Sequence, residues 1–162
     1  MAALGHLAVG LAAKRVAPEM NVGYLILGAY VLDILWFGFN ALGMEPLSKP
    51  PVWDHSLLMG MVWSVLFGVI AARTGRNARA GVVFGLMVFS HWVVDFITHP
   101  MTALSPTDRG LPLWFGNSPL IGLGLYSTMA GVWVTEIGSV IVGLAIYIWA
   151  RKRMKRMKAC IA

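Results

Sequence analysis

Three ionisable side chains lie four residues apart near the end of one long apolar segment. They are His91, Asp95 and His99. On an α-helix such side chains share a face, and these three span about 80° of arc at roughly 100° per residue. Two imidazoles and a carboxylate on one face are a ligand set for a divalent metal ion. The pattern fits equally well a buried His–Asp hydrogen bond that only ties two helices together.

The composition places these side chains in a membrane protein. Of the 162 residues, 58% are hydrophobic and 12% are charged, and the mean hydropathy is +0.72. A soluble domain has about 45–50% apolar and 25% charged residues. An ionisable side chain inside a membrane span costs about 2.5–3.5 kcal/mol, so it usually faces the interior of the bundle. We therefore expect one all-α membrane domain over residues 1–162, a polytopic helical bundle.

Apolar segments separated by charged or proline-containing stretches predict four full spans, because a bilayer needs about 20 residues per helix. A shorter apolar stretch, residues 1–17, precedes them and is either an interfacial helix or a half-span among the other helices. His6 within this stretch favours the half-span. The four expected spans are residues 22–42, 53–73, 78–98 and 128–150, and a basic tail follows at 151–162.

Lys and Arg are distributed unevenly along this topology. Eleven of the thirteen fall on the side of the C-terminus, and only Lys49 and Arg109 fall on the other. The positive-inside rule then predicts a multi-pass protein of the bacterial inner (plasma) membrane with a cytoplasmic C-terminus. Because the excess charge is a tail, we expect membrane lipids as partners and no nucleic acid. Anionic lipid can bind this tail at about 1 kcal/mol per charge.

The ionisable side chains of different segments fall at similar depths. A helix rises about 1.5 Å per residue, which places these side chains between about 13 Å and 28 Å from the cytoplasmic end. In order of increasing height they are His6, Asp33, His91, Glu136, Asp95, His55 and Asp54. Side chains with unrelated structural roles need not agree in depth in this way. We therefore expect them to form one site in the outer half of the bundle.

The chemistry available to such a site is metal-assisted hydrolysis. A metal ion with an open coordination position lowers the pKa of its bound water to about 7, and a carboxylate takes the proton. The donor types favour zinc, with manganese second. Glu136 and Asp54 are candidate general bases, and His99 at the outer edge is a candidate for binding a substrate head group. The candidate metal ligands are His91, Asp95, His55, Asp33 and His6.

With these residues, the chain resembles a bacterial family of small inner-membrane proteins related to the membrane-bound metal-dependent hydrolases. The resemblance implies a His/Asp metal site in the membrane and hydrolysis of a lipid-linked substrate. Those hydrolases usually have Pro-Asp and a second Asp where this chain has Val31–Leu35, and His-Arg where it has Pro50–Trp53. The matching elements are His6, Leu32-Asp33, Asp54–Leu58, Ser90–Asp95, Gly122–Ser127 and Glu136.

Our first hypothesis is therefore a membrane-embedded metal-dependent hydrolase of a phosphate ester or a lipid-derived substrate. An ion-coupled transporter or permease is the alternative, because intramembrane carboxylates also mark ion pathways. A non-enzymatic membrane protein that uses the polar cluster for helix packing is the third hypothesis. The absence of a polar track towards the cytoplasmic side favours the hydrolase over the transporter.

Overall fold

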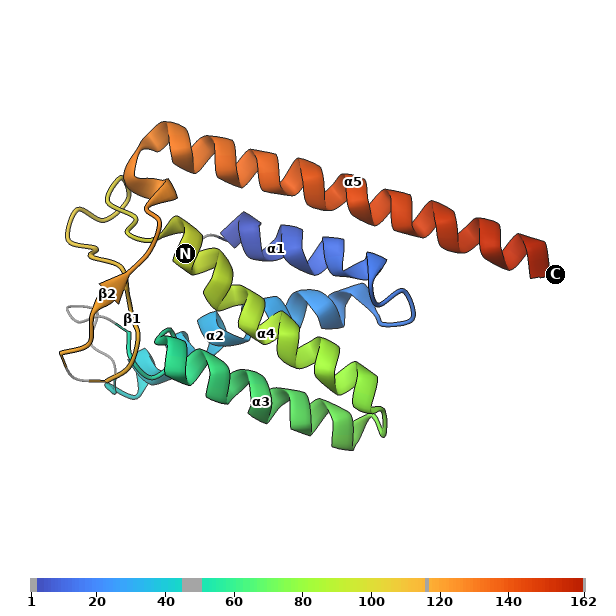
Figure 1. Ribbon diagram of the computed structural model, residues 1–162, viewed down its shortest axis with the longest axis horizontal. Helices are drawn as coiled ribbons and strands as arrows, with labels where there is room; N and C mark the ends of the chain where they lie inside the picture. The colour runs from blue at the N-terminus through green and yellow to red at the C-terminus, as the bar shows by residue number, and fades with distance from the viewer. Residues whose placement is uncertain (1–2, 45–50, 116, 162) are drawn as a thin grey trace.

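The computed structural model describes residues 3–44, 51–115 and 117–161. These residues form five α-helices, two 3-10 helices and one two-stranded sheet (Figure 1). Four of the helices are long and apolar enough to cross a membrane, which confirms the expected all-α membrane bundle. The helices are α1 (Ala3–Ala12), α2 (Val22–Ala41), α3 (Leu57–Thr74), α4 (Ala78–Thr98) and α5 (Met129–Ile161). The remaining elements are η1 (Ala13–Arg15), β1 (Leu111–Pro112), β2 (Leu120–Ile121) and η2 (Leu125–Ser127).

Apolar side chains cover the outside of the bundle, and polar ones lie within it. Val65 is 67% exposed, Leu86 62% and Val134 74%, although all three lie in the middle of helices. An apolar exterior of this kind suits acyl chains rather than water. The buried polar and charged residues are His6, Asp33, Asp54, His55, Ser56, His91, Asp95 and Thr98.

Glycines allow α3 and α4 to pack closely. A Cβ atom added at Gly81 would lie 2.4 Å from the Cβ of Ala72, and one added at Gly85 would lie 2.7 Å from the carbonyl oxygen of Ser64. The GxxxG spacing of α4 therefore serves helix packing, as small residues commonly do between membrane helices.

Helix α1 lies inside the bundle, between α5 and α2 (Figure 1). A Cβ atom added at Gly143 of α5 would lie 2.6 Å from the carbonyl oxygen of Ala8, and one added at Gly10 would lie 2.8 Å from the Cα of Ile26. His6 is 0% exposed. The N-terminal stretch is therefore a short helix enclosed by the others, as the half-span interpretation requires.

Helix α3 begins later than the expected span at 53–73. The side chain of Ser56 accepts a hydrogen bond from the backbone N–H of Met59 at 3.2 Å and caps the helix. Serine is a favoured N-cap because it satisfies an N–H group that has no partner within the helix. Asp54 and His55 therefore lie in the loop before α3, not on the helix as the sequence interpretation assumed.

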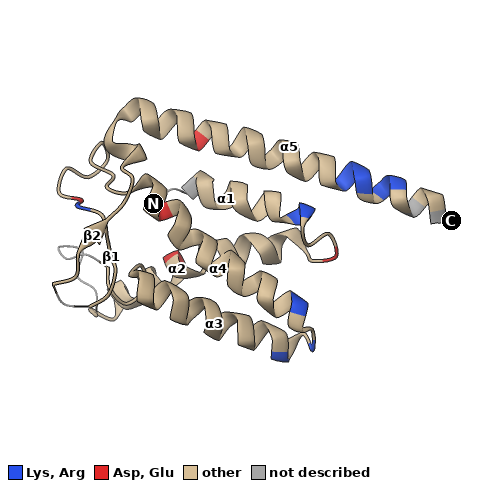
Figure 2. Cartoon of the chain, viewed as in Figure 1, with Lys and Arg blue, Asp and Glu red and all other residues tan. Residues whose placement is uncertain are grey.

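Helix α5 extends through the basic tail to Ile161, so the helix does not end with the apolar segment. Arg, Lys and Met have high helix propensity, which explains this continuation. The Lys and Arg residues of η1, of the α3–α4 turn and of the end of α5 gather at one end of the bundle (Figure 2). Lys49, which the topology prediction placed on the opposite side, lies outside the described residues.

The segment between α4 and α5 folds across the other end of the bundle. Strands β1 and β2 pair antiparallel in this segment. The backbone N–H of Leu58 donates to the carbonyl of Leu113 at 3.0 Å, and that of Leu123 donates to the carbonyl of Phe96 at 2.8 Å. The Ser118 hydroxyl accepts hydrogen bonds from the N–H groups of Leu113 and Trp114. Ser118 therefore stabilises the connection between β1 and β2 and is not the N-cap of a helix.

Candidate metal centre

Side chains from α1, α2, α4 and the loop before α3 converge within the bundle. None of them is more than 6% exposed. Two overlapping groups of three can each hold a metal ion, because every member offers a ligand atom within 4.8 Å of the others. One group is His55, His91 and Asp95, and the other is His6, Asp33 and His91. The structure thus brings together all five of the predicted metal ligands.

The first group has the dimensions of a metal site. His55 Nε2 lies 3.1 Å from His91 Nε2, and Asp95 Oδ2 lies 3.4 Å and 3.3 Å from the same two nitrogens. Ligands about 2.0–2.1 Å from a tetrahedral ion lie about 3.3 Å from one another. Asp33 Oδ1 is 3.7 Å from both nitrogens, but Asp33 forms no metal-capable group with Asp95. Imidazoles and carboxylates are donors that suit zinc.

Hydrogen bonds at the far side of each imidazole orient the ligand nitrogens. The Nδ1–H of His91 donates to the carbonyl of Ala29 at 2.7 Å. A carbonyl only accepts, so His91 Nδ1 carries a proton, and Nε2 is the nitrogen that faces the cluster. The Nδ1 of His55 lies 2.5 Å from Asp54 Oδ1. Metal-binding histidines commonly have a carboxylate or carbonyl partner of this kind.

The contact between His55 Nε2 and His91 Nε2 requires a proton or a metal ion between the two rings. Two nitrogen lone pairs would otherwise repel at 3.1 Å. Burial lowers the pKa of His55, but the neighbouring carboxylates of Asp33, Asp54 and Asp95 outweigh burial and raise the pKa to about 10. These carboxylates favour positive charge at this position.

Several polar atoms of the cluster are buried without a hydrogen bond, and two of them, His6 Nε2 and Asp95 Oδ1, lie 3.3 Å from each other. Unpartnered buried polar atoms are rare in folded proteins, because each one loses the hydrogen bonds that it made with water. A polar cluster that only joins helices would satisfy its own groups. Among the described residues, the side-chain atoms without a hydrogen-bond partner are His6 Nδ1, His6 Nε2, Asp33 Oδ2, Asp54 Oδ2 and Asp95 Oδ1.

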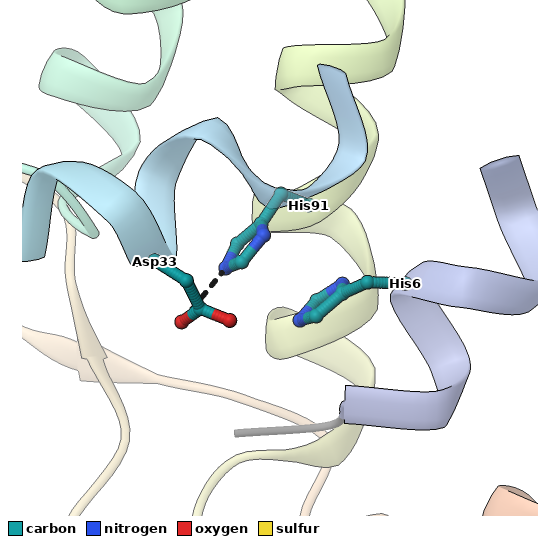
Figure 3. A group of neighbouring side chains, drawn as sticks. All are labelled: His6, Asp33 and His91. Carbon is teal, nitrogen blue, oxygen red and sulfur yellow. Dashed lines mark ion pairs between the residues drawn. The ribbon is translucent and has the colours of Figure 1, made fainter. Parts of the chain in front are cut away.

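His6 reaches the cluster from α1 and faces the same space as Asp33 and His91 (Figure 3). Its ring stacks on the ring of His91, with centroids 3.7 Å apart and an angle of 11° between the planes. His6 Nε2 lies 3.3 Å from Asp95 Oδ1. No spacing rule predicts this contact, because α1 and α4 are far apart in the sequence.

Glu136 belongs to neither metal-capable group. Its Oε1 accepts a hydrogen bond from the hydroxyl of Tyr126 at 2.5 Å, and its Oε2 accepts one from the backbone N–H of Leu4 at 2.9 Å. Burial and the Glu136 carboxylate raise the pKa of Tyr126, so the hydroxyl remains a donor. The structure therefore gives Glu136 the role of holding the N-terminus of α1, and the predicted role as a base has no support from its position.

Asp54, the other predicted base, contacts His55 directly and is fully buried. One of its oxygens orients the imidazole, and the other has no hydrogen-bond partner among the described residues. Asp54 is therefore placed to act on the metal centre through His55. The backbone of His55 is also held, because the indole N–H of Trp92 donates to its carbonyl at 3.0 Å. The partners Ala29 and Trp92 are absent from the sequence prediction, since neither residue type indicates metal chemistry.

His99 lies at the edge of the cluster, just after α4. Its Nδ1–H donates to the carbonyl of Asp95 at 3.0 Å, and its Nε2 lies 3.6 Å from Asp108 Oδ2. Burial lowers the pKa of His99, so the imidazole is neutral near pH 7. The side chain is 15% exposed, more than the ligands around it. The predicted role in binding a substrate head group stays a prediction, and His99 also binds the end of α4.

A scan against protein-family models, a search of curated proteins and a search of solved structures found no match to this chain. The resemblance to the membrane-bound metal-dependent hydrolases therefore stays a prediction from the motifs. The functional argument rests on the residues and on their geometry.

Proposed function

We propose that this chain is a membrane-embedded metal-dependent hydrolase that acts on a phosphate ester or another lipid-derived substrate. The observation that carries the proposal is the group formed by His55 Nε2, His91 Nε2 and Asp95 Oδ2, whose separations of 3.1–3.4 Å match the spacing of ligands around one ion. Asp33 Oδ1 is the next carboxylate oxygen, 3.7 Å from both nitrogens, and zinc is the first candidate ion and manganese the second.

A divalent ion at this position would lower the pKa of a bound water and polarise a phosphoryl or carbonyl oxygen. The chain's own residues prepare the site for that chemistry. Asp54 and the carbonyl of Ala29 hold the two imidazoles with Nε2 towards the cluster. Asp33 Oδ2 and Asp95 Oδ1 have no hydrogen-bond partner among the described residues.

The location of the cluster supports a hydrolase over a transporter. A transporter needs polar groups across the whole membrane thickness. Between the cluster and the basic end of the bundle, the described residues form an apolar core around α1, α2 and α4. That core comprises Ala13, Ala17, Met20, Leu25, Ala29 and Met87.

The buried polar atoms without a hydrogen bond support a hydrolase over a protein that uses the cluster only for packing. The resemblance to membrane-bound metal-dependent hydrolases supports the same reading. If the C-terminus is cytoplasmic, as the Lys and Arg distribution predicts, the cluster lies towards the periplasmic side of a bacterial inner membrane. We therefore expect a substrate with its reactive group near the outer interface, such as a phospholipid or a lipid phosphate.

The test is phosphate release from lipid phosphate esters by the detergent-purified chain after incubation with zinc or manganese. We expect hydrolysis by the wild type, loss of activity in Asp95→Asn, and full activity in Glu19→Gln. Glu19 is an exposed carboxylate that pairs with Arg79 away from the cluster. Metal-loaded protein that releases no product from any of these esters, or activity that persists in Asp95→Asn, would contradict the proposal.

A further inference from the structure

Some potential ligand atoms of the His/Asp cluster do not bind the ion proposed above. Both ring nitrogens of His6, together with Asp33 Oδ2 and Asp95 Oδ1, lack a hydrogen-bond partner among the described residues. His6 is 0% exposed, Asp95 1% and Asp33 4%, so water at the protein surface does not satisfy these atoms. Three side chains from three different helices thus present unused ligand atoms.

The two aspartates divide their oxygens between different imidazoles. Asp95 Oδ2 faces His55 and His91, whereas Asp95 Oδ1 lies 3.3 Å from His6 Nε2. Asp33 Oδ1 lies 3.7 Å from both His55 Nε2 and His91 Nε2, whereas its Oδ2 has no hydrogen-bond partner among the described residues. An ionised carboxylate can bind one cation at each oxygen. Both aspartates are therefore arranged as bridging ligands.

His6 is placed to bind on this second side. It forms a metal-capable group with Asp33 and His91, and neither of the two groups contains both His6 and His55. The single free nitrogen of His91 faces His55, because its Nδ1 is bonded to Ala29. The ligand atoms that remain on this side are those of His6 and Asp33, together with Asp95 Oδ1, which lies 3.3 Å from His6 Nε2.

The charge of the cluster also leaves room for a second cation. Asp33, Asp54 and Asp95 are all buried, and the one ion pair of a Lys or Arg among the described residues joins Arg79 and Glu19, outside the cluster. One divalent ion would leave these three carboxylates with a net negative charge. Uncompensated buried charge is costly, so a further positive charge is needed. A second divalent ion would supply it, and three carboxylates with two such ions carry a net charge of +1.

We propose that His6, Asp33 Oδ2 and Asp95 Oδ1 bind a second divalent ion, and that Asp33 and Asp95 bridge it to the ion held by His55 and His91. This inference rests on the proposed function, because the two ions share ligands. Pairs of ions about 3.5–4 Å apart are typical of enzymes that cleave phosphate esters, where they stabilise the attacking and the leaving oxygens. The second site thus identifies phosphate esters as the substrate class.

The experiment is a Mn²⁺ titration of the detergent-purified full-length chain, followed by electron paramagnetic resonance. The wild type should bind two ions per chain and give the spectrum of a spin-coupled pair. His6→Ala and His6→Gln should bind one ion per chain and give the signal of an isolated Mn²⁺. Val9→Ala, on the same helix, is the matched control and should behave like the wild type.

Each other outcome has a definite meaning. If the wild type and the His6 variants all bind one ion, the second site is wrong and the first site stands. If the His6 variants still bind two ions, His6 is not a ligand and the inference is wrong. If the wild type binds no ion, the proposed function fails as well. Should the His6 variants not fold, the wild type alone decides, because a single uncoupled ion would overturn the proposal.

Discussion

Replacement of Asp54 by Asn tests whether this residue acts through His55. The carboxylate lies 2.5 Å from His55 Nδ1 and is fully buried. Asn has nearly the same shape and retains an oxygen that can accept the Nδ1–H, but it carries no charge. A hydrogen bond to a charged group is roughly twice as strong as a neutral one. The substitution therefore weakens the orientation of the imidazole without creating a cavity.

Loss of such a partner weakens metal binding by about 10–100-fold, which corresponds to about 1.4–2.8 kcal/mol. We expect a loss of this size for zinc in Asp54→Asn, measured by competition with a fluorescent chelator in detergent. Asp108→Asn is the matched control, because Asp108 is another loop aspartate whose oxygens accept hydrogen bonds from Met101 and Gly110. Its zinc affinity should equal that of the wild type.

The result distinguishes orientation from base catalysis. If Asp54 acted only as a general base, Asp54→Asn would leave the zinc affinity unchanged and would lower only the rate of hydrolysis. An Asp54→Asn protein that binds zinc as tightly as the wild type would therefore refute the argument from the His55 contact. Equal weakening in Asp108→Asn would refute it too, because the loss would then be a general effect on the loops.

Three further predictions concern stability in detergent. Glu136→Ala removes the hydrogen bonds to Tyr126 and Leu4, so it should lower the free energy of unfolding by about 2–3 kcal/mol and reduce the melting temperature; an unchanged melting temperature would contradict this role. Gly81→Ala should destabilise the protein by about 1–3 kcal/mol through overpacking against α3. Gly38→Ala should not, because an added Cβ at this position meets nothing within 4 Å. Thermal unfolding of both variants tests the difference. Chelation should lower the melting temperature of the wild type, because an ion at 100 times its Kd stabilises the folded state by about 2.7 kcal/mol, and the same chelator should not shift His91→Ala.

The spans were predictable because apolar length and local capping agree. The expected span at 78–98 coincides with α4, which Asn77 caps by accepting a hydrogen bond from the N–H of Ala80. The start of α3 was not predictable from apolarity, because Trp53 lies before the capping residue Ser56 and looks like part of the span. The end of α5 was missed because the thickness of the bilayer limits only the length of the apolar segment. The helical backbone continues beyond that segment into the basic tail.

The site was predictable in outline from helical spacing and depth. Spacing placed His91 and Asp95 on one face of α4, and depth brought the other segments to the same level. Depth does not say which helices are neighbours, so it did not show that Glu136 contacts Tyr126 and the N-terminus of α1 and lies outside both metal-capable groups. The nitrogen that each histidine presents depends on tertiary contacts, such as the carbonyl of Ala29, for which the sequence has no signal.

The central claim is that the imidazoles of His55 and His91 and the carboxylate of Asp95 bind one metal ion. X-ray absorption spectroscopy of the zinc-loaded, gel-filtered protein tests this most directly. We predict nitrogen and oxygen ligands at about 2.0–2.1 Å, with outer-shell scattering from imidazole that decreases in His91→Ala. A wild-type protein that retains no zinc after gel filtration, or zinc whose spectrum is the same in His91→Ala, would contradict the account.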